Sequence, residues 1–295
     1  MQTRRVPALC ALGLAVAVAA IAAALPAFAA QEIPDGDMPP PATETDALYR
    51  CVTIVTGTRI ETRLPGFEEC LREALVRVTG DQAILKDRRL ARAAKHAGDD
   101  VARYSYHDRL AGRPVHDEQG THDRPHDLTV DFDRAKVDAL ARKLGREPWP
   151  VPRPRVVVLL AVENIRHAFV LTRDGTIDRS ADMREAFAAA AAKAALPPVT
   201  FPTEAEIAAR GWSYRTVPGI TGADAEALTR ADGGDAAVVG HIVFSEKALG
   251  WIVGWRMAWQ GTRYTWRTRG VSFDAAFRHA LAGAAQVMAV HRAPK

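Results

Sequence analysis

The sequence of 295 residues has few of the features that reveal a protein's class directly. Three cysteines are too few for a disulfide-rich secreted scaffold, and aromatic residues make up only 7% of the chain. No Gly-x-Ser-x-Gly, His-Glu-x-x-His, Walker or Gly-x-Gly-x-x-Gly motif is present, so no familiar hydrolase or nucleotide site is indicated. After residue 30, no apolar run reaches the ~18 residues needed to cross a membrane. Hydrophobic residues still amount to 48%, which excludes global disorder.

An export signal is indicated at the N-terminus. Arg4 and Arg5 precede an apolar run over residues 8–25, and Ala27-Phe28-Ala29 has the small-x-small pattern of a cleavage site. We therefore predict a cleaved signal peptide over residues 1–29 and a periplasmic location. The alternative is an uncleaved membrane anchor, but polar residues follow the cleavage site at once.

The charge balance argues against one broad class of partner. Loss of residues 1–29 would remove two of the 39 basic residues and leave 37 against 35 acidic ones, a net charge of +2 in place of +4. Nucleic acid is then excluded by the compartment and by the lack of a basic excess to drive counterion release.

Two proline-rich segments divide the chain. Residues 30–46 carry five acidic residues, no Lys or Arg and three consecutive prolines, which predicts a disordered linker. Alternating prolines over residues 148–154 deny the hydrogen bonds of helix and strand. We therefore predict an N-terminal domain over residues 47–147 and a C-terminal domain over residues 154–292.

Both domains are predicted to be α/β (more strictly α+β), each a mixed or antiparallel sheet with helices packed on it. A strand over residues 48–56 and an apolar helical stripe over residues 67–79 begin the order β-α-α-β-β-α. The second domain has the order β-α-β-α-α-β-β-β-α, with aliphatic runs at 156–162 and 236–244 that are typical of buried strands. Its helix starts are indicated by capping residues: Asp182 with Glu185, Thr203 with Glu206, Thr221 with Asp224, and Ser272.

The cysteines outside the signal peptide are Cys51, on the first strand, and Cys70, on the first helix. Neighbouring elements usually lie side by side, and an oxidising compartment permits a disulfide between them. The alternative is a pair of buried thiols packing as small apolar groups, because Cys70 lies on the apolar helix face.

Histidine and carboxylate residues gather between residues 107 and 127. Such groups can hold a divalent metal, and His122 and His126 have the spacing of helical ligands. Gly120 and Pro125 deny a helix there, however, so a charged hairpin loop is the simpler interpretation, and pH sensing by the histidines is a further alternative. The residues are His107, Asp108, His116, Asp117, Glu118, His122, Asp123, His126 and Asp127.

The last two predicted strands, on either side of the Gln260-Gly261 turn, are aromatic on one face and basic on the other. Trp251, Trp255 and Trp259 occupy alternate positions, which indicates core packing rather than a platform for stacking a sugar or base. The opposite face can bind an anionic partner such as phospholipid headgroups or cell-wall carboxylates, although a solvated face needs fewer assumptions. That face carries Arg256, Gln260, Arg263, Arg267 and Arg269.

Several motifs of the first domain are distinctive in combination. They are Leu48-Tyr49-Arg50, Thr53-Ile54-Val55-Thr56-Gly57, the run from Gly66 to Asp81, Asp117-Glu118-Gln119-Gly120-Thr121, Asp123-Arg124-Pro125, the run from Asp127 to Asp133, Pro148-Trp149 and Arg153-Pro154. With them the chain resembles a bacterial family, the domain of unknown function 2066. The resemblance implies an exported protein without an established activity. It also implies that histidines 122 and 126 are not characteristic, which leaves Asp117, Glu118, Asp123, Arg124 and Asp127 as candidate binding residues.

The second domain resembles the small α/β modules of envelope accessory proteins, such as lipoprotein activators of cell-wall synthases. The strand from Asp235 to Ile242, followed by a hairpin and a terminal helix, carries this resemblance. We therefore predict a non-catalytic, envelope-associated binding factor that needs no cofactor and has an envelope protein or a cell-wall component as its partner. One alternative is a metal-dependent hydrolase that uses the loop of residues 107–127, and another is a structural protein without a ligand.

Overall fold

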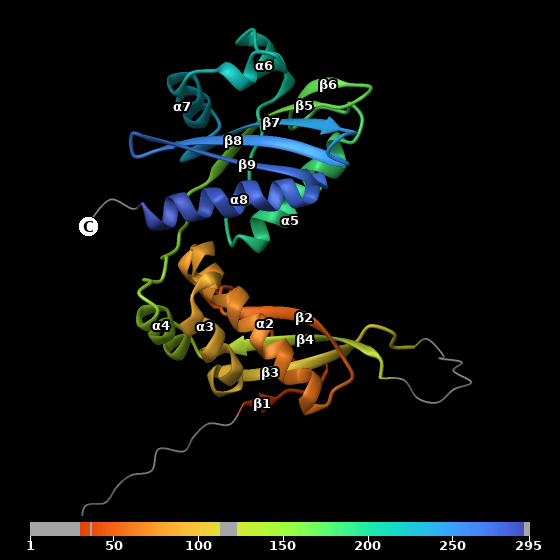
Figure 1. Ribbon diagram of the computed structural model, residues 1–295, viewed down its shortest axis with the longest axis vertical. Helices are drawn as coiled ribbons and strands as arrows, with labels where there is room; N and C mark the ends of the chain where they lie inside the picture. Colours follow the sequence, from red (N-terminus) through yellow and green to blue (C-terminus); the bar gives the residue numbers. More distant parts are fainter. Residues whose placement is uncertain (1–29, 36, 113–122, 292–295) are drawn as a thin grey trace, which may run out of the picture.

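The computed structural model describes residues 30–35, 37–112 and 123–291 (Figure 1). It confirms the α/β class, with two separate sheets and helices packed on each. The predicted signal peptide, residues 1–29, lies outside the described residues, and the domain boundaries stay predictions. Within the described ranges, every helix is too short or too polar to cross a bilayer. We call residues 30–147 the N-terminal lobe and residues 154–291 the C-terminal lobe.

The N-terminal lobe is built on a four-stranded sheet in the order β1-β3-β4-β2. Strands β2, β3 and β4 pair antiparallel, and the short β1 pairs parallel with β3. In chain order the elements are β1 (Gln31–Glu32), α1 (Glu44–Ala47), β2 (Arg50–Thr56), α2 (Ile60–Thr79), η1 (Gln82–Lys86), α3 (Arg88–Ala93), η2 (Ala94–Asp100), β3 (Val101–Asp108), β4 (Pro125–Phe132) and α4 (Arg134–Lys143).

Helix α2 packs its apolar stripe on this sheet, with Phe67, Leu71 and Leu75 buried. It begins at Ile60, seven residues before the predicted start, and carries Pro65 inside. Packing on the sheet outweighs the tendency of Pro65 and Gly66 to interrupt a helix. At Gly66 the helix lies so close to the sheet that an added Cβ would be 2.8 Å from Leu128 and 2.9 Å from Val55.

Residues 30–46 also differ from the structureless linker that we predicted. Gln31 and Glu32 pair with β3, and the carboxylate of Glu32 accepts a hydrogen bond from the Tyr104 hydroxyl at 2.8 Å. Thr43 caps α1 by accepting from the Asp46 amide. A strand of two residues has no periodicity, so its position depends on contacts with distant residues.

The structure pairs Cys51 with Cys70 in a disulfide that joins β2 to α2, with Cα atoms 5.4 Å apart. The bridge closes a loop across 19 positions, and closing such a loop destabilises the unfolded chain by about 3 kcal/mol.

We expect Cys51→Ala with Cys70→Ala to lower the free energy of unfolding by about that amount, measured by urea denaturation. Reduced wild-type protein should show the same loss, and an unchanged midpoint on reduction would contradict the prediction.

The C-terminal lobe is built on a five-stranded sheet in the order β6-β5-β7-β8-β9. Strands β5 and β7 are parallel, and the other neighbours are antiparallel. In chain order the elements are β5 (Val156–Glu163), β6 (Ala168–Leu171), α5 (Ser180–Lys193), α6 (Glu204–Ala209), η3 (Val217–Gly219), α7 (Gly222–Ala231), β7 (Ala236–Ser245), β8 (Gly250–Trp259), β9 (Thr262–Val271) and α8 (Phe273–Val290).

The two faces of this sheet are covered differently (Figure 1). Helices α5 and α8 cover one face, where Trp255 is buried with Phe187 and Phe277. The aromatic row of β8 is therefore core, as predicted. On the other face, α6, η3 and α7 pack over β5 and β7, with Ile207 and Leu228 buried against them. Strands β8 and β9 thus have a covered face and a more open one.

Three details of the C-terminal lobe depart from the sequence prediction. Strand β6 was not anticipated, and residues 199–201 form only a bridge between Thr200 and Val157. Helix α5 begins at Ser180 rather than after Asp182, because the carboxylate of Asp182 instead bonds the Arg179 side chain at 3.0 Å.

Candidate functional site

The predicted binding residues at the end of the β3–β4 hairpin are placed only in part. Asp117 and Glu118 lie outside the described residues. The carboxylate of Asp123 pairs with Arg59, and the guanidinium of Arg124 donates to Asp108 at 2.8 Å. Each described charge therefore has a partner of opposite sign on a neighbouring strand or turn.

The remaining residues of this hairpin behave in the same way. Asp127 lies 3.4 Å from Arg109, and His107 lies 3.2 Å from Asp35. The ring of His126 contacts the backbone carbonyl of Arg124 at 2.8 Å. The described part of the chain contains no group of three or more metal-ligating side chains, and histidines 116 and 122 lie outside it. The described hairpin residues satisfy one another and leave no convergent site.

A different surface, on β8 and β9, gathers charge that is not neutralised. Cross-strand pairing places Arg263 opposite Ala258 and Arg267 opposite Gly254, while Arg256 lies opposite Thr265. Arg269 lies opposite Ile252. All four arginines project from the face opposite buried Trp255 and the partly buried Trp251, Trp259 and Trp266. We call Arg256, Arg263, Arg267 and Arg269 the arginine face.

Three members of the arginine face are exposed and unpaired. The side chains of Arg263, Arg267 and Arg269 make no ion pair or hydrogen bond within the described residues. Arg256 is half-buried and donates to the Val217 carbonyl at 3.1 Å. Burial lowers the pKa of Arg256, and the nearby charge of Arg263 lowers it further. The face therefore carries like charges close together, an arrangement that an anion would stabilise.

The N-terminal sheet shows the contrasting arrangement. Arg50 and Arg103 share the carboxylate of Asp131 at distances of 2.5 to 2.8 Å. Burial would raise the pKa of that carboxyl, but the hydrogen bonds from both arginines outweigh it and hold the pKa below its usual range. Among described residues, no carboxylate forms an ion pair with Arg263, Arg267 or Arg269.

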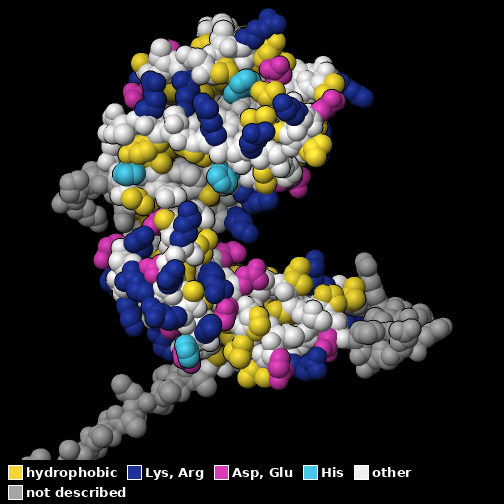
Figure 2. Space-filling view, in the orientation of Figure 1, with side chains coloured by type: hydrophobic (Ala, Val, Ile, Leu, Met, Phe, Trp, Pro, Cys, Tyr) yellow, Lys and Arg dark blue, Asp and Glu magenta, His cyan; other side chains and the backbone are white. Residues whose placement is uncertain are grey.

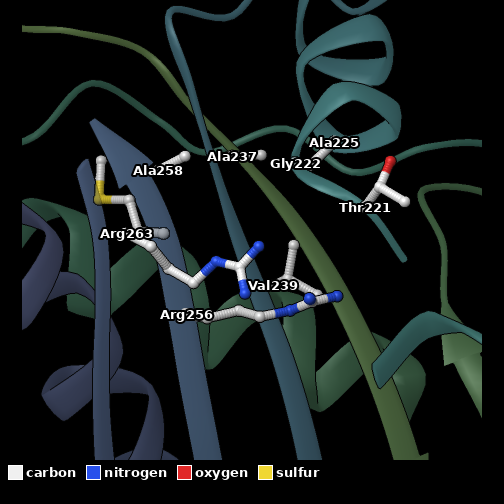
Figure 3. A pocket seen from close by; sticks show the side chains of 9 residues that line it. Thr221, Gly222, Ala225, Ala237, Val239, Arg256, Ala258 and Arg263 are labelled. Carbon is white, nitrogen blue, oxygen red and sulfur yellow. The ribbon is translucent and has the colours of Figure 1, made fainter. Parts of the chain in front are cut away.

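A small pocket lies where the arginine face meets the start of α7. Figure 3 shows Arg256 and Arg263 extending over the sheet toward Thr221 and Gly222. The Thr221 hydroxyl and the Asp224 carboxylate cap the first turn of α7, so that helix end is already satisfied. The charged groups that line the pocket are the two guanidinium groups, which can bind a carboxylate or phosphate oxygen.

Comparison with protein families identifies one region of the chain. Residues 42–150, which are less than half of the chain, match a family described as a domain of unknown function (DUF8605). The match is not to domain of unknown function 2066. The predicted resemblance was therefore wrong, although it was right that the region is a domain of unknown function. No curated protein and no solved structure matches the chain.

The motifs that suggested the other family have structural roles that many domains share. Gly80 ends α2 with φ of 71°, Asp133 caps α4, and the alternation over Asp127–Asp133 is the register of β4. Such residues specify a topology without distinguishing families. The DUF8605 match ends at residue 150, so the arginine face lies beyond it.

The sequence indicated the arginine face, although it favoured the hairpin residues as the candidate binding site. The signal was the alternation of arginines after the Gln260-Gly261 turn. What the sequence did not show is that α6, η3 and α7 pack mainly over β5 and β7 and leave Arg263, Arg267 and Arg269 exposed, which requires the strand order.

Proposed function

We propose that this chain is an exported periplasmic protein that acts by binding, as an envelope-associated accessory factor, and that its arginine face binds an acidic segment of a partner protein. The observation that carries the proposal is the row of three unpaired arginines on β9. The signal-like N-terminal sequence supports the location.

The position of β9 favours a partner in extended conformation. It is the outermost strand of the sheet, so its outer edge has no neighbouring strand among the described residues. An added strand would place alternate side chains on the arginine face at intervals of about 7 Å, directly beside the arginines. Acidic side chains at alternate positions would then meet Arg263, Arg267 and Arg269. Arginine at an edge also prevents pairing with neutral strands, which makes the edge selective.

The test uses a synthetic peptide with glutamate at every second position and threonine between, labelled for fluorescence anisotropy. The protein begins at Ala30, because the preceding apolar segment would confuse binding. We expect Arg267→Glu with Arg269→Glu to weaken binding about tenfold or more, equivalent to about 1.4 kcal/mol. Amide exchange should slow in β9 when the peptide is bound.

A matched variant separates this site from general electrostatic attraction. Arg88→Glu with Arg92→Glu reverses the same number of charges on the N-terminal lobe and should leave peptide affinity nearly unchanged. A lysine–threonine peptide of the same length should not bind. Equal losses in both double variants, or no peptide binding by the wild type, would refute the proposal.

A further inference from the structure

A second basic surface lies on the N-terminal lobe, where α3 meets the end of α4. Figure 2 shows Lys and Arg side chains gathered over these helices. The guanidinium of Arg89 holds the two helices together by donating to the Lys143 carbonyl at 3.1 Å and the Leu144 carbonyl at 3.0 Å. Cations from two separate stretches of sequence are thereby brought to one surface. They are Lys86, Arg88, Arg89, Arg92, Lys95, Arg142, Lys143 and Arg146.

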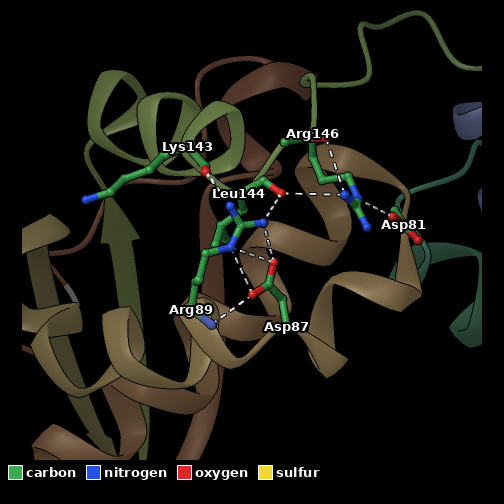
Figure 4. Close-up of polar contacts among 7 residues, drawn as sticks. Asp81, Asp87, Arg89, Lys143, Leu144 and Arg146 are labelled. Carbon is green, nitrogen blue, oxygen red and sulfur yellow. Dashed lines mark hydrogen bonds and ion pairs between the residues drawn. The ribbon is translucent and has the colours of Figure 1, made fainter.

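The carboxylates of this surface are already engaged. Asp87 pairs with Arg89, and Asp81 pairs with Arg146 (Figure 4). Glu147 lies 3.4 Å from Arg142. These three pairs account for three of the eight cations.

Five exposed cations are left without a carboxylate partner among the described residues. Arg88 and Arg92 lie one turn apart on α3, and Lys95 follows on η2, so the three share one side of the helix. Lys86 and Lys143 lie at its margins. The neighbouring Leu85 is an apolar side chain that is 48% exposed. We call Lys86, Arg88, Arg92, Lys95 and Lys143 the basic surface.

We infer that the basic surface docks on the anionic phospholipid headgroups of a bilayer. Its cations are long, exposed side chains spread over four elements, η1, α3, η2 and α4, which suits a field of headgroup charges better than one compact anion. The exposed Leu85 beside them can enter the interfacial region while the charges stay at headgroup level. This inference concerns the other lobe and is independent of the proposed function of the arginine face.

The test is co-sedimentation of the chain from Ala30 onward with vesicles of equal parts phosphatidylglycerol and phosphatidylethanolamine. We expect binding to these vesicles and none to pure phosphatidylcholine vesicles. Arg88→Glu, Arg92→Glu and Lys95→Glu together should weaken binding at least tenfold. Raising salt should release the wild type, because the Debye length contracts from about 10 Å at 0.1 M to about 3 Å at 1 M.

Control variants distinguish the basic surface from other charged residues of the chain. Arg166→Glu with Arg230→Glu and Arg278→Glu reverses three exposed charges of the C-terminal lobe outside the arginine face and should leave vesicle binding unchanged. Should the first triple variant fail to fold, Lys86→Glu with Lys143→Glu tests the margins of the same surface. Equal binding to both vesicle types, or full binding by the basic-surface variants, overturns the inference. Free glycerol phosphate that binds as tightly as the vesicles would also overturn it, since the ligand would then be a soluble phosphate.

Discussion

Replacing Gly240 by alanine is expected to lower the free energy of unfolding by about 3 kcal/mol or more. Gly240 lies mid-strand in β7, directly opposite Trp255 of β8. An added Cβ would lie 2.1 Å from the Trp255 ring and 2.8 Å from a methyl group of Leu160. The ring cannot retreat, because Trp255 is 2% exposed and packs against Phe187 and Phe277. Urea denaturation followed by circular dichroism measures the loss.

The neighbouring strand offers a matched control. Gly254 lies one position before Trp255, but its Cβ position has no atom within 4 Å, so Gly254→Ala should change stability by about 0.5 kcal/mol or less. The second check is a double-mutant cycle. In a Trp255→Leu background, Gly240→Ala should cost at least about 1 kcal/mol less than in the wild type, because the ring that it strikes is gone. Additive losses would show that the clash is not the cause.

The parts of the fold that the sequence predicted well are those fixed by local chemistry. Thr203 with Glu206 and Thr221 with Asp224 form complete capping boxes, since both partners lie within one helical turn. Ser272 caps α8 in the same way by accepting from the Ala275 amide. The aromatic row of β8 was also predictable, because side-chain alternation is a property of any strand.

The parts that could not be predicted depend on distant residues. Strand β1 is held by Tyr104, whose hydroxyl bonds Glu32 and whose carbonyl accepts from the Ile33 amide. The start of α2 depends on how closely Gly66 approaches the sheet. Neither contact leaves a periodic pattern in the sequence.

The candidate sites show the same difference between local patterns, which the sequence predicts, and distant contacts, which it does not. The alternation after residue 260 was enough to indicate an arginine-bearing strand, but its edge position required the full strand order. The basic surface could not be predicted from the sequence, because α3 and the end of α4 are joined only in the fold, where Arg89 donates to the Lys143 and Leu144 carbonyls. The closely spaced hairpin carboxylates were predicted to form a binding site, but Asp123 and Asp127 each pair with an arginine.

The joint between the lobes is centred on a buried arginine that forms no ion pair with a carboxylate among the described residues. Arg153 is 3% exposed and stacks on Trp149, with the guanidinium carbon 4.4 Å from the ring centroid. It donates to the Arg77 carbonyl in the last turn of α2 and, at 2.9 Å, to the Ala195 carbonyl just after α5. The negative ends of two helices thus take the place of a carboxylate. Burial, reinforced by the charge of Arg77, lowers the pKa of Arg153 to about 10, so it stays charged at neutral pH.

We expect Arg153→Met to lower the free energy of unfolding by about 3 kcal/mol, because it leaves helix-terminal carbonyls of both lobes buried without a donor. Urea denaturation should then resolve two transitions if this side chain couples the lobes. Arg153→Lys keeps the charge but cannot reach both helix ends, so its loss should be intermediate. Arg155→Met is the matched control: its side chain is 62% exposed and lies 3.8 Å from Asp235, so its removal should cost about 0.5 kcal/mol or less. Equal stability of the Arg153→Met and Arg155→Met variants would mean that apolar packing at Trp149 alone holds the joint.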